Sequence, residues 1–143
     1  VVAAVAVGPL ARPSRFASGG AAPSAAAPGT RWEPVRPKRV AELPAQGTPV
    51  FVNFTAAWSI TCLVNERVAL NTPAVAEAFA RKGVVYLKAD WTNKSSQIAA
   101  LLESFGRSGV PLYVVYGRST AERPQVLPQI LSETGLIETI DKL

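Results

Sequence analysis

The sequence predicts an α/β domain in which a central mixed β-sheet carries helices on both faces. Short β-rich runs alternate with segments of helical periodicity, and glycine, proline and Thr-Pro signals separate them. The chain has 143 residues, 48% of them hydrophobic, which suffices for one domain with a core of its own. The expected order is strand, helix, strand, helix, strand, short strand, helix, which is typical of such a sheet.

The first strand and the helices after it have clear boundaries. Residues 49–55 (PVFVNFT) form a β-rich run typical of a buried strand. Apolar residues then recur at roughly helical spacing over 56–70, where Ser59 is placed to cap the helix. A second helical piece begins at the pair Thr72-Pro73, with threonine as N-cap and proline in the first turn. It ends at Gly83, which suits the left-handed conformation after a helix.

The second half of the domain continues the alternation. Residues 84–90 (VVYLKAD) predict a strand, and 95–105 place their apolar residues on one face of a helix. A third strand is expected over 112–116 (LYVVY) and a short one over 126–131 (VLPQIL). The chain closes with a helix over 132–143.

The N-terminal part differs in composition from the rest. Residues 1–11 (VVAAVAVGPLA) are apolar but shorter than the ~20 residues that span a bilayer. They are read as the end of a transmembrane segment or, alternatively, as an apolar tail. Residues 12–31, rich in Ala, Pro, Ser and Gly, predict a flexible linker. The domain is expected over 32–143, with a short helix at 39–43 in its lead-in.

Charge and composition exclude several classes of function. The formal net charge is 15 − 10 = +5, but residues 1–44 hold six basic against two acidic side chains. The remainder holds nine against eight, so the body lacks the basic surface expected for nucleic-acid binding. The chain has no histidine and one cysteine, which rules out a Ser-His-Asp triad and an internal disulfide. We expect no metal site and no cofactor.

The segment Trp58-Ser59-Ile60-Thr61-Cys62 carries the chemical signal. It lies where a strand passes into a helix, and unpaired backbone N–H groups in a first helical turn favour a thiolate. In a Cys-x-x-Cys pair the first, exposed sulfur attacks a disulfide and the second resolves the mixed disulfide. Here Ser59 holds the first position and Cys62 the second. The spacing is that of a CxxC motif variant with an oxygen in place of the attacking sulfur.

Four stretches together carry a resemblance to a known family: FVNFTAAWSITCLVNERVAL, LKADWT, LLESFGRSGVPLYVVY and VLPQIL. They resemble the C-terminal thioredoxin-like domain of the DsbD family, bacterial thiol:disulfide interchange proteins also called protein-disulfide reductases. The resemblance covers about residues 32–143. It implies a thioredoxin-like fold, a central mixed β-sheet flanked by helices on both faces. It also implies a membrane-embedded domain ahead of this one and a place on the periplasmic side of the inner membrane.

The resemblance assigns roles to residues of this chain. Cys62 matches the resolving cysteine, and Ser59 stands at the position of the attacking cysteine. Trp58 matches the tryptophan that flanks the redox pair. Val110 and Pro111 match a cis-proline loop that binds the partner's extended backbone.

Two further residues match positions that tune the pair. Glu66, one turn after Cys62, matches an acid of this kind. Asn53 matches a position often held by a buried Asp, and because an amide accepts no proton, base assistance from this position is in doubt.

The expected function is thiol–disulfide exchange. The resemblance implies that the domain receives electrons from the membrane-embedded domain and passes them to a disulfide-bearing periplasmic partner. Because the attacking thiolate would have to be a cysteine at position 59, we expect this form to be inactive. Ser59 is either an engineered replacement, which the otherwise intact neighbourhood favours, or a natural variant. The alternatives are a redox-inactive binding module and a peroxidase-like enzyme that uses Cys62.

Overall fold

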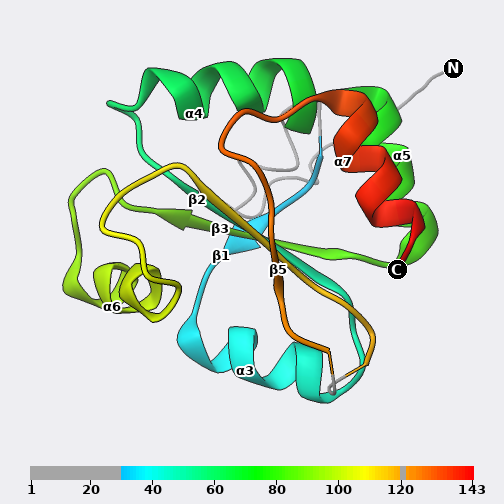
Figure 1. Cartoon of the computed structure of the whole chain (residues 1–143), viewed down its shortest axis with the longest axis horizontal. Coiled ribbons are helices and arrows are strands. Elements are labelled where there is room, and N and C mark those ends of the chain that lie inside the picture. The colour runs from blue at the N-terminus through cyan, green and yellow to red at the C-terminus, as the bar shows by residue number, and fades with distance from the viewer. Residues whose placement is uncertain (1–29, 120–121) are drawn as a thin grey trace, which may run out of the picture.

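The computed structural model describes residues 30–119 and 122–143, so the expectations for 1–29 lie outside the described residues. Its centre is a five-stranded mixed sheet in the order β1-β3-β2-β4-β5 (Figure 1). The neighbours β1, β3 and β2 pair in parallel, whereas β4 runs antiparallel to β2 and β5 antiparallel to β4. The strands are β1 (Glu33–Pro34), β2 (Val50–Thr55), β3 (Val85–Asp90), β4 (Leu112–Tyr116) and β5 (Gln125–Val126).

Helices cover both faces of this sheet, as predicted. Figure 1 shows α4, α5 and α7 on one side and α3 and α6 on the other. A π-helical segment, η3, continues α4 without a break. The helical segments are α3 (Pro37–Ala45), α4 (Ile60–Asn65), η3 (Glu66–Leu70), α5 (Pro73–Lys82), α6 (Ser96–Ser104) and α7 (Glu133–Asp141).

Strand β2 separates two apolar cores, and all six of its residues are buried. Alternate side chains of a strand point to opposite faces, so Phe51 enters the core beneath α5 and α7. There its ring lies 5.4 Å from the rings of Phe79 and Tyr86. Val52 and Phe54 enter the other core, beneath α3 and α6. The central strand therefore belongs to both cores at once.

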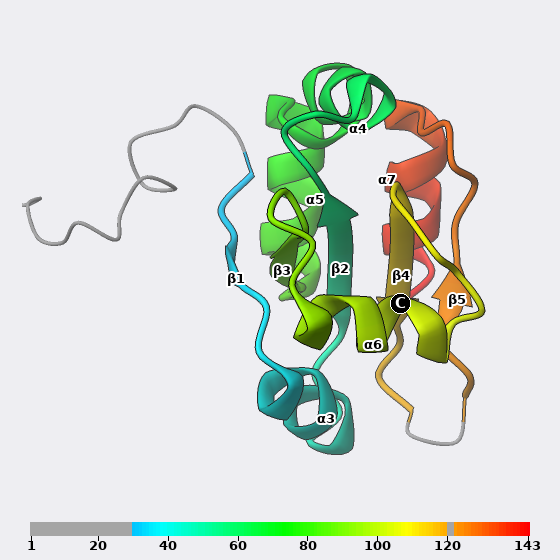
Figure 2. The same ribbon diagram turned by 90° about the vertical axis from the view of Figure 1, so that its left-hand side faces the viewer.

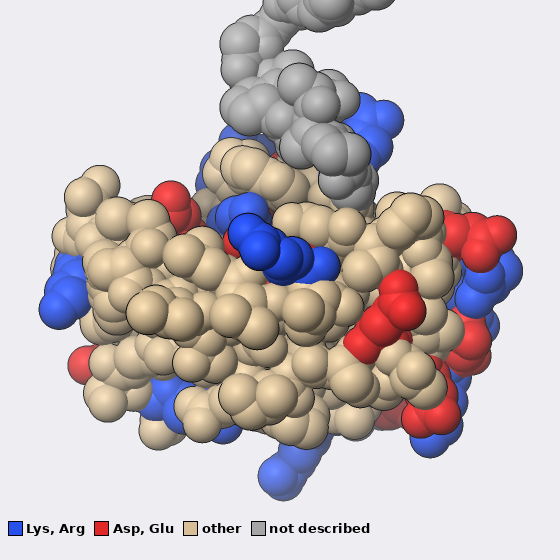
Figure 3. All heavy atoms as spheres, turned by 90° about the horizontal axis from the view of Figure 1, so that it is seen from above, with Lys and Arg blue, Asp and Glu red and all other residues tan. Residues whose placement is uncertain are grey.

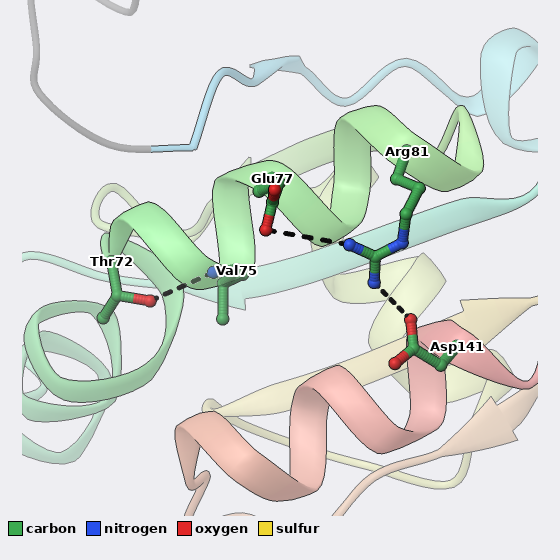
Figure 4. Close-up of polar contacts among 5 residues, drawn as sticks. All are labelled: Thr72, Val75, Glu77, Arg81 and Asp141. Atoms are coloured by element: carbon green, nitrogen blue, oxygen red, sulfur yellow. Dashed lines mark hydrogen bonds and ion pairs between the residues drawn. The ribbon is translucent and has the colours of Figure 1, made fainter.

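The predicted boundaries of α5 are confirmed. The Thr72 hydroxyl accepts a hydrogen bond from the Val75 N–H at 3.2 Å (Figure 4), and Gly83 ends the helix with a φ of 66°. Arg81 then links α5 to α7, with its guanidinium 3.8 Å from Glu77 and 2.5 Å from Asp141. Because these ionic groups are half exposed or more, most of the stabilisation between the helices comes from the apolar core beneath them.

Three elements differ from expectation. The helix predicted to be capped by Ser59 begins at Ile60, as expected, but it changes from α to π geometry at Glu66. The strand predicted over 126–131 is limited to Gln125–Val126, because the chain turns there to bury Leu127 and Leu131. Strand β1 was not predicted, since two residues carry no periodic signal.

Buried Asn65 fastens the end of α4 to two distant segments. Its amide Nδ2 donates to the Tyr113 hydroxyl at 2.8 Å and to the Gln129 carbonyl at 2.7 Å. Its Oδ1 accepts from the Leu131 N–H at 3.1 Å. Burial raises the pKa of Tyr113, which keeps its hydroxyl neutral at physiological pH. One amide therefore satisfies polar groups of β4 and of the segment that leads into α7.

We predict that Asn65→Ala lowers the free energy of unfolding by about 2–4 kcal/mol, because it leaves buried donors and acceptors without partners. Urea denaturation followed by circular dichroism measures the change. The matched control is Gln97→Ala on the exposed side of α6, which should stay within about 0.5 kcal/mol of the parent. A loss for Asn65→Ala as small as that of the control would contradict the fastening role.

Candidate functional site

The candidate site lies where β2 passes into α4, at the upper end of the sheet in Figure 2. Ser59 has an extended backbone, and its hydroxyl accepts a hydrogen bond from the Cys62 N–H at 3.3 Å. This confirms Ser59 as the N-cap. Cys62 lies in the first turn of α4 with a fully buried side chain, whereas Ser59 is half-buried. Position 59 is thus accessible from outside, and Cys62 is enclosed behind it.

A loop after β3 holds the segment in front of α4. The indole Nε1 of Trp58 donates to the Thr92 carbonyl at 3.0 Å, and the Ala57 N–H donates to the Thr92 hydroxyl at 2.8 Å. The Thr92 hydroxyl in turn donates to Asp90. The rings of Trp58 and Trp91 lie 6.1 Å apart. Trp58 is therefore held at its nitrogen while 49% of its surface stays exposed.

Sequence reasoning included Thr92 in the motif KADWT but assigned it no role. The contact partners of Thr92 are 34 and 35 residues away in the chain. No local pattern indicates such a pairing. The available signal was the parallel arrangement of β2 and β3, which brings the segments after both strands to one edge of the sheet.

The Val110-Pro111 peptide bond is cis, as the resemblance implied. Pro111 is buried and directly precedes β4, whose first residue, Leu112, pairs with Phe54 of β2. Because Phe54 is the second-last residue of β2, this loop lies beside the end of the strand that leads to Ser59. Predicted site residues from two distant parts of the chain thus meet at one end of the sheet.

Asn53 and Glu66 are also brought together, behind the first turn of α4. The Asn53 amide is fully buried and donates to Glu66 Oε2 at 3.2 Å and to the Tyr86 hydroxyl at 3.0 Å. Its Oδ1 is buried with no hydrogen-bond partner among the described residues. Burial and, to a lesser extent, the charge of Glu66 raise the pKa of Tyr86, so its hydroxyl stays neutral. Glu66 is the acidic residue of this cluster.

Glu66 also faces a small pocket that holds further charges. The pocket has a volume of about 180 Å³, and its lining includes Glu66, Lys88 and Asp90. The Lys88 ammonium lies 4.4 Å from the centre of the Trp32 ring, and no carboxylate of the described residues lies within 4 Å of it. Lys88 therefore makes a cation–π contact with Trp32, near the start of the domain.

Two further properties concern residues 30–119 and 122–143. No three acidic or cysteine side chains gather there in a way that would hold a metal ion. None of the helices in this part of the chain has both the length and the apolar character needed to cross a bilayer.

Comparison with known proteins agrees with this geometry. A family model described as thioredoxin-like matches residues 31–117. Over 81 residues the chain is 32% identical to the thiol:disulfide interchange protein DsbD of Klebsiella pneumoniae and 31% identical to that of Salmonella typhimurium. These matches cover 57% of the chain but only 13% and 14% of the two relatives, so the chain spans about a seventh of their length.

Solved structures show the same fold. The reduced DsbD C-terminal domain of Neisseria meningitidis aligns over 77% of this chain and 97% of its own, with 22% identity and a TM-score of 0.61. A thioredoxin from Thermus thermophilus aligns over 80% and 86%, with 18% identity and a TM-score of 0.62.

The family match begins just before β1 and ends just after β4, so it includes the central strands, the start of α4 and the cis-proline loop. The curated relatives named as DsbD support the thiol–disulfide oxidoreductase class for a domain of this architecture. The chain belongs to the thioredoxin-like family.

Proposed function

We propose that this domain is the exchange module of a protein-disulfide reductase. In this proposal it takes reducing equivalents from a membrane-embedded domain of the same protein and passes them to disulfide-bearing partners on the periplasmic side of a bacterial inner membrane. The observation that carries the proposal is the pair of positions 59 and 62. The first caps α4 at the surface, and the second is sealed one turn deeper.

The exchange proceeds in two displacements when position 59 holds a cysteine. Its thiolate attacks one sulfur of the partner's disulfide, a new S–S bond forms, and the partner's other sulfur leaves as a thiolate. The Cys62 thiolate then attacks the sulfur at position 59 and releases the partner with both thiols reduced. The domain is left with a disulfide between 59 and 62, and two electrons have moved to the partner. Ser59 cannot perform the first step, because its hydroxyl forms no disulfide.

The surrounding residues support these steps. Trp58 and the Val110-Pro111 loop flank position 59 and form the surface against which the partner's extended backbone lies. Cys62 must lose its proton before the second displacement, and the Asn53 amide cannot take it. Glu66 is held by Asn53 and is one turn after Cys62, so we assign the proton-accepting role to this carboxylate.

The alternative proposal is a redox-inactive binding module that holds extended segments in the same place. Ser59 itself favours it, because the chain as given lacks the attacking sulfur.

Restoring the missing sulfur tests the redox proposal. We expect Ser59→Cys to reduce the disulfides of insulin with dithiothreitol as the electron source, while the chain with Ser59 stays at the background rate. The double variant Ser59→Cys, Cys62→Ser serves as control, and we expect it to stop at a mixed disulfide. A folded Ser59→Cys protein without turnover would remove the redox proposal and leave the binding module.

The burial of Cys62 gives a further prediction. We expect iodoacetamide to modify Cys62 in the native chain at least ~100-fold more slowly than in urea. The reagent must reach the thiolate, and the Cys62 side chain is buried in the folded domain. Mass spectrometry of timed samples measures both rates. Equal rates would show an exposed thiol and would favour the peroxidase-like reading of this cysteine.

The contacts of Thr92 give another prediction, made in the Ser59→Cys protein. Thr92→Val removes the acceptor for the Ala57 N–H, so we expect reductase kcat/KM to fall by about 3–10-fold. Thr92→Ser keeps the hydroxyl and should restore most of the activity. If Thr92→Val and Thr92→Ser are equally impaired, the hydroxyl does not position the loop.

A further inference from the structure

The outer side of α4 and η3 exposes apolar side chains where a helix of this kind would normally present polar ones. We call this surface the α4–η3 groove, lined by Ile60, Leu63, Val64, Arg67 and Val68, with a volume of about 370 Å³. Its four apolar residues are 77%, 47%, 51% and 49% exposed, in that order. They follow the i, i+3, i+4, i+8 spacing of one helical face. A continuous apolar face at the surface marks a contact site.

The groove begins at the candidate site. Ile60 directly follows position 59, and Val68 lies eight residues further, about 12 Å along the helix axis. In Figure 3, which looks down on the end of the molecule that carries α4, uncharged side chains cover most of the surface. An extended chain advances about 3.3 Å per residue, so about four residues of a partner would span the groove.

Arg67 is the charged residue among those that line the groove. Arg67 is exposed and makes no ion pair within the described part of the chain. Lys94 lies over the exposed Trp58 ring at 5.2 Å, on the segment that follows β3. The Glu66 carboxylate accepts a hydrogen bond from buried Asn53, whereas Asp90 is exposed and accepts from Thr92. The Arg67 guanidinium therefore remains for a ligand.

We propose that the α4–η3 groove binds the polypeptide segment that adjoins the partner's disulfide, and that this segment is apolar with a carboxylate that pairs with Arg67. The inference rests on the proposed function and adds the chemistry of the partner to it. Arg67 lies eight residues after position 59, so the carboxylate belongs about four residues from the partner's reactive cysteine. A guanidinium between apolar side chains favours a carboxylate because it can donate two parallel hydrogen bonds.

Designed peptides test the proposal in the Ser59→Cys protein. Each peptide has one cysteine in a mixed disulfide with 5-thio-2-nitrobenzoate, two leucines, and either Glu or Lys four residues from the cysteine, on its N-terminal or C-terminal side. The thiolate at position 59 displaces the coloured thiolate, whose absorbance gives the rate. We expect the better Glu peptide to react about 10-fold faster than its Lys counterpart at low salt, and Arg67→Glu to reverse the preference.

Two controls make the result specific. Arg123→Glu changes an exposed charge in the segment just before β5, outside the groove, and should keep the Glu preference. For the double variant Val64→Ser, Val68→Ser, we expect the ratio of the peptide rate to the rate with neutral hydroxyethyl disulfide to fall about 5-fold. An unchanged preference in Arg67→Glu, or an unchanged ratio in the double variant, would overturn the proposal.

Binding without chemistry separates this inference from the proposed function. Fluorescein-labelled peptides with serine in place of cysteine are titrated with the Ser59 chain and followed by anisotropy. A Glu preference that Arg67→Glu reverses supports the groove even if the Ser59→Cys protein reduces no disulfide. Absence of any preference overturns it even if hydroxyethyl disulfide is reduced. A dimer in analytical ultracentrifugation that the Val64→Ser, Val68→Ser variant abolishes would assign the groove to a second copy instead.

Discussion

The complete burial of β2 is the constraint on which the rest of the domain depends. A strand whose six residues all lie in the interior must be paired on both edges and covered on both faces, which β3, β4 and the two helical layers accomplish. Groups that react with other molecules must therefore lie beyond its end, where the chain enters α4. The parallel neighbour β3 and the antiparallel neighbour β4 bring Thr92 and Pro111 to that same end. The candidate site thus follows from how the central strand is enclosed.

Near the candidate site, the buried strand β2 carries a neutral polar residue, and the acidic residue lies on a neighbouring element. Asn53 is neutral, so it can be fully buried in β2 without a counterion, although its Oδ1 has no partner among the described residues. The ionisable carboxylate of the cluster is on η3, where Glu66 borders a pocket. Lys88 lines the same pocket, and its ammonium makes a cation–π contact with the Trp32 ring. In the proposed mechanism, the group that takes the proton of Cys62 therefore lies at the edge of the core rather than on β2.

Local signals were sufficient for the features that depend on neighbouring residues. Ser59 and Thr72 were predicted as N-caps and Gly83 as the residue that ends a helix, and all three are confirmed. Each of these predictions depends only on the residues around one helix end. The features that sequence reasoning missed involve residues far apart. Asn65 joins groups 48 to 66 residues away, and no pattern around it indicates those partners. The cis bond before Pro111 was anticipated through family resemblance, since neighbouring residues alone do not determine the isomer.

Oxygen and sulfur at position 59 differ in their effects on chemistry and on stability. Serine is among the preferred N-cap residues, and its hydroxyl accepts the Cys62 N–H that would otherwise lack an acceptor at the start of α4. Sulfur is a weaker acceptor, so a cysteine here caps the helix less well while gaining a thiolate near the positive end of the helix. The N–H group that donates to the hydroxyl in the serine form would face a thiolate in a cysteine form. A reactive sulfur at this position would be stabilised by the same N-terminal end of α4 whose N–H group Ser59 caps in this chain.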